Sequence, residues 1–152
     1  MFCIREAKLE DIHLISSIMI TSFRTAFAAF VSGETMDSCT NPDNCYEMRK
    51  QIYISGKMRI LIGDDKGFIC WQESEKEAEI VALHSLPESW GTGLGNAMLT
   101  QALAQIESGT VFLWTFEKNL RARRFYEKHG FRFADVRRIS EFDGAVEMRY
   151  EK

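Results

Sequence analysis

The chain is short of the residues that mark several classes of protein. It has two prolines and four cysteines in 152 residues, and no two cysteines form a CxxC pair. Structural zinc sites and disulfide frameworks depend on such spacings, so we expect free thiols and no bound metal. A zinc site built on Cys39 and Cys45 is the alternative, and it lacks the usual ligand spacing.

Long apolar runs and an excess of basic residues are also absent. No run reaches membrane-spanning length, and the first residues lack a secretory signal, so we expect a cytoplasmic protein with no membrane partner. The net charge of −3 lacks the basic footprint of a nucleic-acid-binding surface. The length predicts one domain over residues 1–152, and both a monomer and a homodimer stay open.

What the chain does have is three glycines at alternate positions between an extended and a helical pattern. Gly91, Gly93 and Gly95 follow the strand-like residues 78–86, and apolar residues then recur at helical spacing up to Ile106. Glycine permits positive φ, and the first turn of a helix has unpaired N–H groups and a positive dipole end. The pattern therefore predicts a site for a phosphate or diphosphate, with a simple flexible turn or helix cap as the alternative.

The remaining patterns predict an α/β domain with a mixed sheet. Helical periodicity runs from Ile12 to Phe30, ended by residues 31–33, and again over 45–54, with a polar irregular stretch at 34–44 between them. Further strands are predicted at 2–7, 59–62, 67–72, 111–116, 131–139 and 145–150, and a further helix at 119–129. Short polar turns make the strands at 59–86 antiparallel, whereas the helix after residue 91 makes 78–86 and 111–116 parallel neighbours.

A second motif narrows the interpretation. Residues 119–131 match N-x-x-A-x-x-F-Y-x-x-x-G-F directly after an apolar strand. Together with the glycine stretch, this segment resembles the GCN5-related N-acetyltransferase (GNAT) superfamily. The resemblance implies the acyl-CoA N-acyltransferase fold: a mixed, mostly antiparallel sheet flanked by helices, with a splayed parallel pair at the cofactor site. It also implies transfer of an acetyl group from acetyl-CoA to a primary amine by direct attack.

The resemblance assigns the cofactor contacts residue by residue. The strand backbone would pair with the pantetheine arm, the loop N–H groups would hold the diphosphate, and Arg121 or Arg124 would reach the 3′-phosphate. The expected cofactor-binding residues are Leu83, His84, Ser85, Trp90, Gly91, Thr92, Gly93, Leu94, Gly95, Asn96, Asn119, Arg124 and Tyr126. One position departs from the family pattern, because Trp90 stands where the family usually has Arg or Gln.

Three residues are candidates for catalysis. Tyr126 is the expected general acid, since its phenol can protonate the departing thiolate. Glu79 is the preferred base for the amine proton, and His84 is the alternative base. In regular pleating His84 and Glu79 would point to opposite faces of the sheet, whereas a β-bulge near Leu83 would change that parity.

The acceptor is the least determined part of the prediction. Aromatic and acidic residues in the first helices and the closing hairpin suit a small cationic amine such as a polyamine or amino sugar, although a peptide amine also fits. These residues are Phe23, Phe27, Phe30, Glu34, Asp37, Asp43, Glu141 and Asp143. The alternatives to an enzyme of this kind are a non-catalytic acyl-CoA-binding regulatory module and a dinucleotide-dependent oxidoreductase, which the glycine spacing disfavours.

Overall fold

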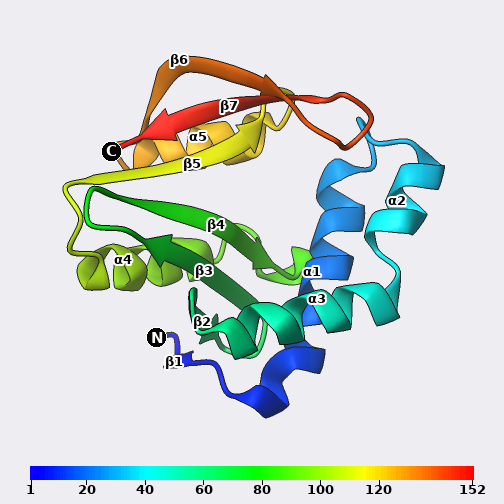
Figure 1. The fold of residues 1–152 in the computed structure, drawn as a ribbon, viewed down its shortest axis with the longest axis horizontal. Helices are drawn as coiled ribbons and strands as arrows, with labels where there is room; N and C mark the ends of the chain where they lie inside the picture. Colours follow the sequence, from blue (N-terminus) through cyan, green and yellow to red (C-terminus); the bar gives the residue numbers. More distant parts are fainter.

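A computed structural model describes all residues, 1–152, as one seven-stranded sheet with helices on both faces (Figure 1). The helices are α1 (Ile12–Phe27), α2 (Gly33–Cys39), α3 (Pro42–Ser55), α4 (Leu94–Gln105) and α5 (Leu120–Lys128), with short 3-10 turns η1 (Leu9–Asp11) and η2 (Pro87–Ser89). The strands are β1 (Ile4–Glu6), β2 (Arg59–Gly63), β3 (Gly67–Glu73), β4 (Glu77–Ser85), β5 (Thr110–Phe116), β6 (Arg132–Ile139) and β7 (Val146–Glu151).

The strand order confirms the predicted mixed sheet. The order is β1-β2-β3-β4-β5-β7-β6, and every neighbouring pair is antiparallel except β4 and β5, which are parallel. α4 makes the crossover between these two strands, as the single-helix connection requires. The closing hairpin places β7, rather than β6, beside β5.

Two hydrophobic cores lie on opposite faces of the sheet. One core joins apolar residues of β3, β4 and β5 to α4, with side chains of α5 packed against it. The other joins β2 and β3 to α1, and includes Cys45 of α3. β4 therefore runs between two packed faces, and the alternation of its side chains decides which residues face which helices.

The segment between the first and third helices differs from the prediction. α1 ends at Phe27, and the polar stretch expected to be irregular contains α2. The Ser32 hydroxyl caps α2 by accepting the Thr35 N–H at 3.1 Å, and Asp143 of the β6–β7 loop accepts hydrogen bonds from both residues. The helix depends on this long-range contact, which local sequence patterns do not contain.

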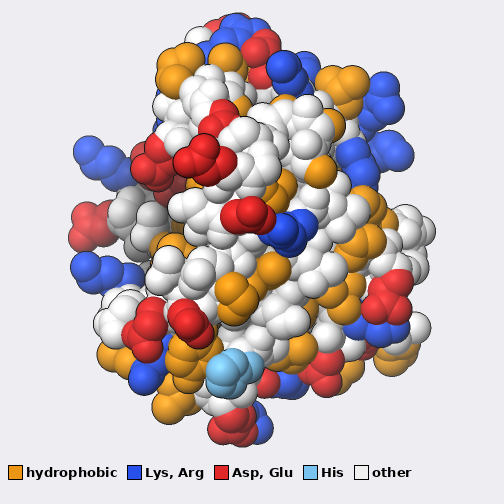
Figure 2. Space-filling view, turned by 90° about the vertical axis from the view of Figure 1, so that its right-hand side faces the viewer, with side chains coloured by type: hydrophobic (Ala, Val, Ile, Leu, Met, Phe, Trp, Pro, Cys, Tyr) orange, Lys and Arg blue, Asp and Glu red, His pale blue; other side chains and the backbone are white.

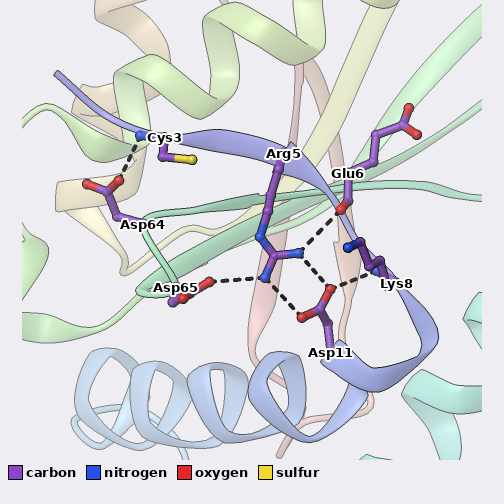
Figure 3. Close-up of polar contacts among 7 residues, drawn as sticks. All are labelled: Cys3, Arg5, Glu6, Lys8, Asp11, Asp64 and Asp65. Carbon is purple, nitrogen blue, oxygen red and sulfur yellow. Dashed lines mark hydrogen bonds and ion pairs between the residues drawn. The ribbon is translucent and has the colours of Figure 1, made fainter.

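A cluster of charged residues fixes the N-terminal strand (Figure 3). The Arg5 guanidinium donates to both carboxylate oxygens of Asp11, at 2.8 and 3.0 Å, and to Asp65 in the β2–β3 turn at 3.1 Å. Asp11 also accepts the Lys8 N–H at 2.7 Å, and Asp64 accepts the Cys3 N–H at 2.7 Å. The cluster thus ties β1 to both η1 and the β2–β3 turn.

The face that carries α1, α2 and α3 has no large patch of one charge. Figure 2 shows acidic, basic and hydrophobic side chains interspersed over it. None of the helices combines the length and the apolar character needed to span a lipid bilayer.

Candidate active site

The parallel strands β4 and β5 separate after four paired residues and leave a wedge between them. β5 pairs with β4 only over Glu77–Ile80, whereas β3 pairs with β4 as far as Ser85. The second half of β4 therefore lacks a neighbour on its β5 side. A groove of about 550 Å³ begins there and is bounded by β4, the glycine loop, α5 and part of α1.

The glycine loop presents free backbone donors to this groove. The N–H groups of Trp90 and Thr92 are used inside the turn, where they donate to Pro87 and Ser89 carbonyls at 3.1 and 3.2 Å. The N–H groups of Gly91, Gly93, Gly95 and Asn96 donate no hydrogen bond within the chain. Gly91 and Gly93 reach this conformation at φ of 77° and 96°, values that favour glycine. Four free donors at the start of α4 form an anion site.

Gly95 differs from the other two glycines in having no positive φ. A Cβ at this position would lie 3.5 Å from the Phe125 ring, an ordinary van der Waals contact, so α4 and α5 lie close together here without requiring glycine. The next residue, Asn96, contacts Nε2 of His129 through Oδ1 at 2.6 Å, and Nδ1 of His129 lies 2.8 Å from the Phe125 carbonyl oxygen. These contacts join the start of α4 to the end of α5.

Trp90 lines the groove and does not fill it. Its indole Nε1 donates to the Ser85 carbonyl at 3.0 Å, and the Arg121 guanidinium carbon lies 3.6 Å from the ring centroid. A guanidinium over an indole face is an attractive cation–π contact. The pair joins the loop to α5, and the unusual Trp90 thus has a structural partner that the sequence motif does not predict.

Basic side chains of α5 also line the groove. Arg121, Arg124 and Lys128 are exposed and line the groove. Arg123 does not take part, because its side chain donates to the Tyr150 hydroxyl and the Glu117 carbonyl. Three cations and four free N–H groups make this groove suited to several phosphate charges.

The predicted cofactor residues divide into those that line the groove and those that do not. The lining residues are Leu83, His84, Ser85, Trp90, Gly91, Gly93, Gly95, Asn96, Asn119, Arg124 and Tyr126. Thr92 and Leu94 lie outside it: the Thr92 hydroxyl donates to the Ser89 carbonyl at 2.6 Å, and Leu94 is buried in the core. Asn119 uses its side-chain oxygen to cap α5 by accepting the Ala122 N–H at 3.2 Å.

Tyr126 lies on α5 and lines the groove. Its ring packs edge-on against Phe125 and Phe131, with centroid distances of 5.2 and 5.8 Å. Burial raises the pKa of the Tyr126 phenol above its ordinary value, and the nearby Arg121 charge opposes that rise only in part. The phenol consequently keeps its proton at neutral pH.

A β-bulge brings Glu79 and His84 to the same face of the sheet. Trp71 pairs with Ile80 and Cys70 pairs with Ala82, so Val81 is an extra residue on β4. The bulge therefore lies at Val81, upstream of Leu83, and it reverses the side to which the residues after it point. Glu79 and His84 consequently both point to the face that α1 and α3 cover.

The two candidate bases have different surroundings. Glu79 lies outside the groove lining, is partly exposed and accepts a hydrogen bond from Gln72 at 3.2 Å. His84 contacts Ser22 Oγ through Nδ1 at 3.1 Å. Burial, with a smaller contribution from the Arg49 charge, lowers the pKa of His84 to about 3. A neutral imidazole of that kind is a weak proton acceptor.

The acidic residues expected to bind the acceptor are scattered. Asp37 pairs with Arg24 at 2.9 Å, and Asp143 caps α2. Asp43 lies in a separate hollow of about 580 Å³ on the outer side of α1 and α3, which contains none of the other predicted site residues. Phe27 is the member of the aromatic stripe that lines the groove.

Several groove residues were missed by the sequence analysis. Ser22 interrupts the apolar face of α1 where it meets His84, and His129 closes α5 beside the glycine loop. A polar residue on an otherwise apolar helix face is the signal for Ser22. No local signal marks His129, because its partner Asn96 is distant in the sequence.

Comparison with known proteins matches both the motifs and the fold. The family model described as "Acetyltransferase (GNAT) family" matches residues 31–131. The chain is similar to an "Uncharacterized N-acetyltransferase YuaI" of Bacillus subtilis (strain 168), with 26% identity over 136 residues that cover 78% of this chain and 74% of that protein.

Two solved structures share the whole fold. A PaiA N-acetyltransferase from Thermoplasma acidophilum, in complex with coenzyme A, matches with a TM-score of 0.81 and 21% identity, covering 100% of this chain and 99% of that one. Mutant forms of the spermidine/spermine N-acetyltransferase SpeG from Vibrio cholerae match with a TM-score of 0.72 and 17% identity, covering 99% and 92%. At these identities the likeness is one of fold.

Proposed function

The chain belongs to the acetyltransferase (GNAT) family, and from this premise we propose that it transfers an acetyl group from acetyl-CoA to a primary amine by direct attack. The observation that carries the proposal is the row of free N–H groups at Gly91, Gly93, Gly95 and Asn96. They lie at a groove that basic side chains of α5 also line, and this combination fits the diphosphate and 3′-phosphate of coenzyme A.

The residues that would hold the cofactor follow from their positions. The unpaired edge of β4 at Leu83–Ser85 supports an extended arm by backbone hydrogen bonds, as an added strand would. The loop would hold the diphosphate, and Arg124 with Lys128 would neutralise the remaining phosphate charge. Acetyl-CoA supplies an acetyl group activated as a thioester.

Two protons must move during the reaction. An amine attacks only after losing the proton of its ammonium form, and Glu79 is the accepting carboxylate that we assign. The thiolate that leaves must gain a proton, and the protonated Tyr126 in the groove lining is the donor that we assign. The bulge at Val81 puts Glu79 on the same face of the sheet as His84, which lines the groove.

The acceptor in this proposal is a small-molecule or peptide amine. The expected polyamine draws support from the aromatic cluster of Phe23, Phe27 and Phe30, and one structural neighbour is a spermidine/spermine N-acetyltransferase. The carboxylates that a polyamine would need give less support, since Asp37 and Asp143 are engaged elsewhere. A cytoplasmic monomer or homodimer without a nucleic-acid or membrane partner stays part of the proposal.

Thermal-shift measurements and thiol release test the proposal together. We expect acetyl-CoA and CoA, but not NAD, to raise the melting temperature, because only the former match the loop and the basic side chains of α5. Amine-dependent release of free thiol from acetyl-CoA then demonstrates transfer. Stabilisation without thiol release against a broad amine panel would favour the non-catalytic acyl-CoA-binding module, and stabilisation by NAD alone would overturn the assignment.

A further inference from the structure

A buried arginine without a counter-ion lies near His84, on the face of the sheet that α1 and α3 cover. Arg49 of α3 is 8% exposed, and its guanidinium carbon is 5.3 Å from the centroid of the Phe68 ring. Its Nε is the one buried side-chain nitrogen or oxygen of the chain without a hydrogen-bond partner. Arg49 also takes part in none of the ion pairs. Desolvation of an unpaired cation in this environment is unfavourable.

The groups around the guanidinium do not compensate its charge. Cys45 and Cys70 are the nearby thiols, and burial raises the pKa of each, so both are neutral. The Phe68 ring supplies only a cation–π contact, and its centroid lies 5.6 Å from that of His84. The Arg49 charge acts on His84, which lines the groove. The cation therefore lies near His84, outside the groove lining itself, and lacks an anion there.

The surface next to Arg49 is open along β4. Phe68 and Cys70 of β3 are fully buried, whereas their partners His84 and Ala82 on β4 are partly exposed. Glu79 lies further along the same face and is also partly exposed. An acceptor approaching along this strip would meet the carboxylate of Glu79 and the guanidinium of Arg49 on one side of the sheet.

We propose that Arg49 binds an anionic group of the acceptor, so that the preferred substrate is a primary amine that also carries a carboxylate. The inference rests on the proposed acetyl transfer and deepens it by assigning a substrate class. The planar guanidinium matches a carboxylate in two parallel hydrogen bonds, and the low exposure of the site strengthens such a pair. An amine without the carboxylate leaves the cation unpaired, which is the arrangement that gives strong discrimination.

A cluster of aromatic rings reaches the groove at Phe27 and favours a particular side chain on the acceptor. Phe27, Phe30, Phe116 and Phe142 pack against one another at the end of α1, with centroid distances of 5.0 to 6.1 Å for their contacts with Phe116. This cluster suits an apolar or aromatic side chain. An apolar α-amino acid is therefore the simplest acceptor that meets all three requirements.

Matched acceptors test the inference with the full-length protein and acetyl-CoA. The panel compares L-phenylalanine, L-phenylalaninamide and phenethylamine, the same trio built on methionine, and spermidine. For the wild type we expect kcat/KM for the amino acids to exceed that for the amides at least 30-fold. In Arg49→Met this ratio should fall at least tenfold, chiefly through KM for the amino acid, while Arg49→Lys retains part of it.

The control variant is Arg59→Met. Arg59 also lies over an aromatic ring, with its guanidinium carbon 5.5 Å from the Trp71 centroid, but it is exposed and paired with Glu6. This change should leave the acceptor ratio unaltered. Melting temperature and CoA binding of each variant show whether it is folded. As a readout without turnover, N-acetyl-L-phenylalanine should stabilise the CoA-bound wild type and not Arg49→Met.

The results that overturn the inference differ from those that overturn acetyl transfer. Amides, phenethylamine or spermidine turned over as well as the amino acids would end the carboxylate assignment and leave the transferase intact. If no amine releases thiol, the proposed acetyl transfer fails, and the thermal-shift measurement with N-acetyl-L-phenylalanine decides on the anion site. The anion site is rejected if N-acetyl-L-phenylalanine does not stabilise the wild type. It is also rejected if the ligand stabilises Arg49→Met equally. If Arg49→Met does not fold, the ratio of kcat/KM between amino acids and amides is measured in Arg49→Lys instead, and an unaltered ratio rejects the anion site.

Discussion

At the scale of single residues, the site depends on how burial sets the protonation of its groups. Tyr126 packs against aromatic rings, and its desolvation there raises the pKa of the phenol. Desolvation of His84, with a smaller contribution from the Arg49 charge, lowers the pKa of the imidazole to about 3. Each group is thereby held neutral at physiological pH. The proposed mechanism accordingly assigns proton donation to Tyr126 and proton acceptance to Glu79.

Removing the Tyr126 hydroxyl should affect chemistry more than binding. Tyr126→Phe keeps the ring contacts with Phe125 and Phe131, so we expect acetyl-CoA affinity to change less than threefold and kcat to fall at least tenfold. Steady-state kinetics and a CoA titration measure the two effects. Tyr46→Phe, in the outer hollow, is the matched control. Equal turnover in Tyr126→Phe and the wild type would remove the assigned role.

The choice between the two candidate bases gives a second expectation. Because its conjugate acid is strong, His84 contributes little as a proton acceptor above pH 5, and His84→Asn should retain at least a third of the wild-type kcat/KM. Glu79→Gln should lower kcat/KM at least tenfold at pH 7 while leaving the fold intact. The pH dependence of kcat/KM for both variants checks this, and the reverse order of effects would make His84 the base.

At the scale of elements, the glycine loop works because alternate N–H groups are left free. Gly93 has φ of 96°, where an alanine is strained by about 1–2 kcal/mol. Gly93→Ala should therefore weaken CoA binding at least fivefold, because the loop relieves the strain by turning its donors away. Isothermal titration measures the change. Gly109→Ala, at an uncrowded glycine without positive φ, should bind CoA normally, and normal binding by Gly93→Ala would show that the donors are dispensable.

The elements also show which parts of the structure are readable from sequence. Periodicity, glycine spacing and the second motif predicted the strands, α4, α5 and the parallel pair, since these depend on local patterns and on one crossover rule. α2 was not predicted, because the carboxylate of Asp143 supports its first turn from the far end of the chain. The position of the bulge at Val81 depends on pairing with β3, so the sequence left it open.

The site follows the same division. The glycine loop and Tyr126 lie within sequence motifs and were predicted, whereas no motif marks Arg49 in the sequence of α3. Its significance comes from what is missing around it, namely a hydrogen-bond partner for Nε and an ion-pair partner, and that absence is visible only once the elements are packed. Contacts between distant segments, such as Asn96 with His129, are hidden for the same reason.

At the scale of the whole molecule, the first strand is the edge of the sheet and is held by ion pairs as well as by β2. Figure 3 shows Asp11 between Arg5 and the Lys8 N–H, so its carboxylate joins strand, turn and helix. The Arg5 hydrogen bonds lower the pKa of Asp11 below its ordinary value, against the opposing effect of burial. Protonation of this carboxylate is therefore linked to unfolding.

The sign of that linkage gives a prediction for acid stability. A folded-state pKa below the unfolded value means that the contribution of Asp11 is complete above about pH 5 and is lost as the pH falls through the unfolded pKa of about 3.9 toward the lower folded one. Asp11→Asn should lower the free energy of unfolding by about 1–2 kcal/mol at pH 7, a cost between those of exposed and buried pairs. Its deficit against the wild type should shrink between pH 5 and pH 3. Urea titrations across this range measure the deficit.

The control variant is Asp65→Asn, which removes a contact to the same guanidinium from a side chain that is 68% exposed. It should lower the free energy of unfolding by less than about 0.5 kcal/mol at any pH. A deficit that is the same at pH 7 and pH 3 would assign the Asp11 effect to packing instead of charge.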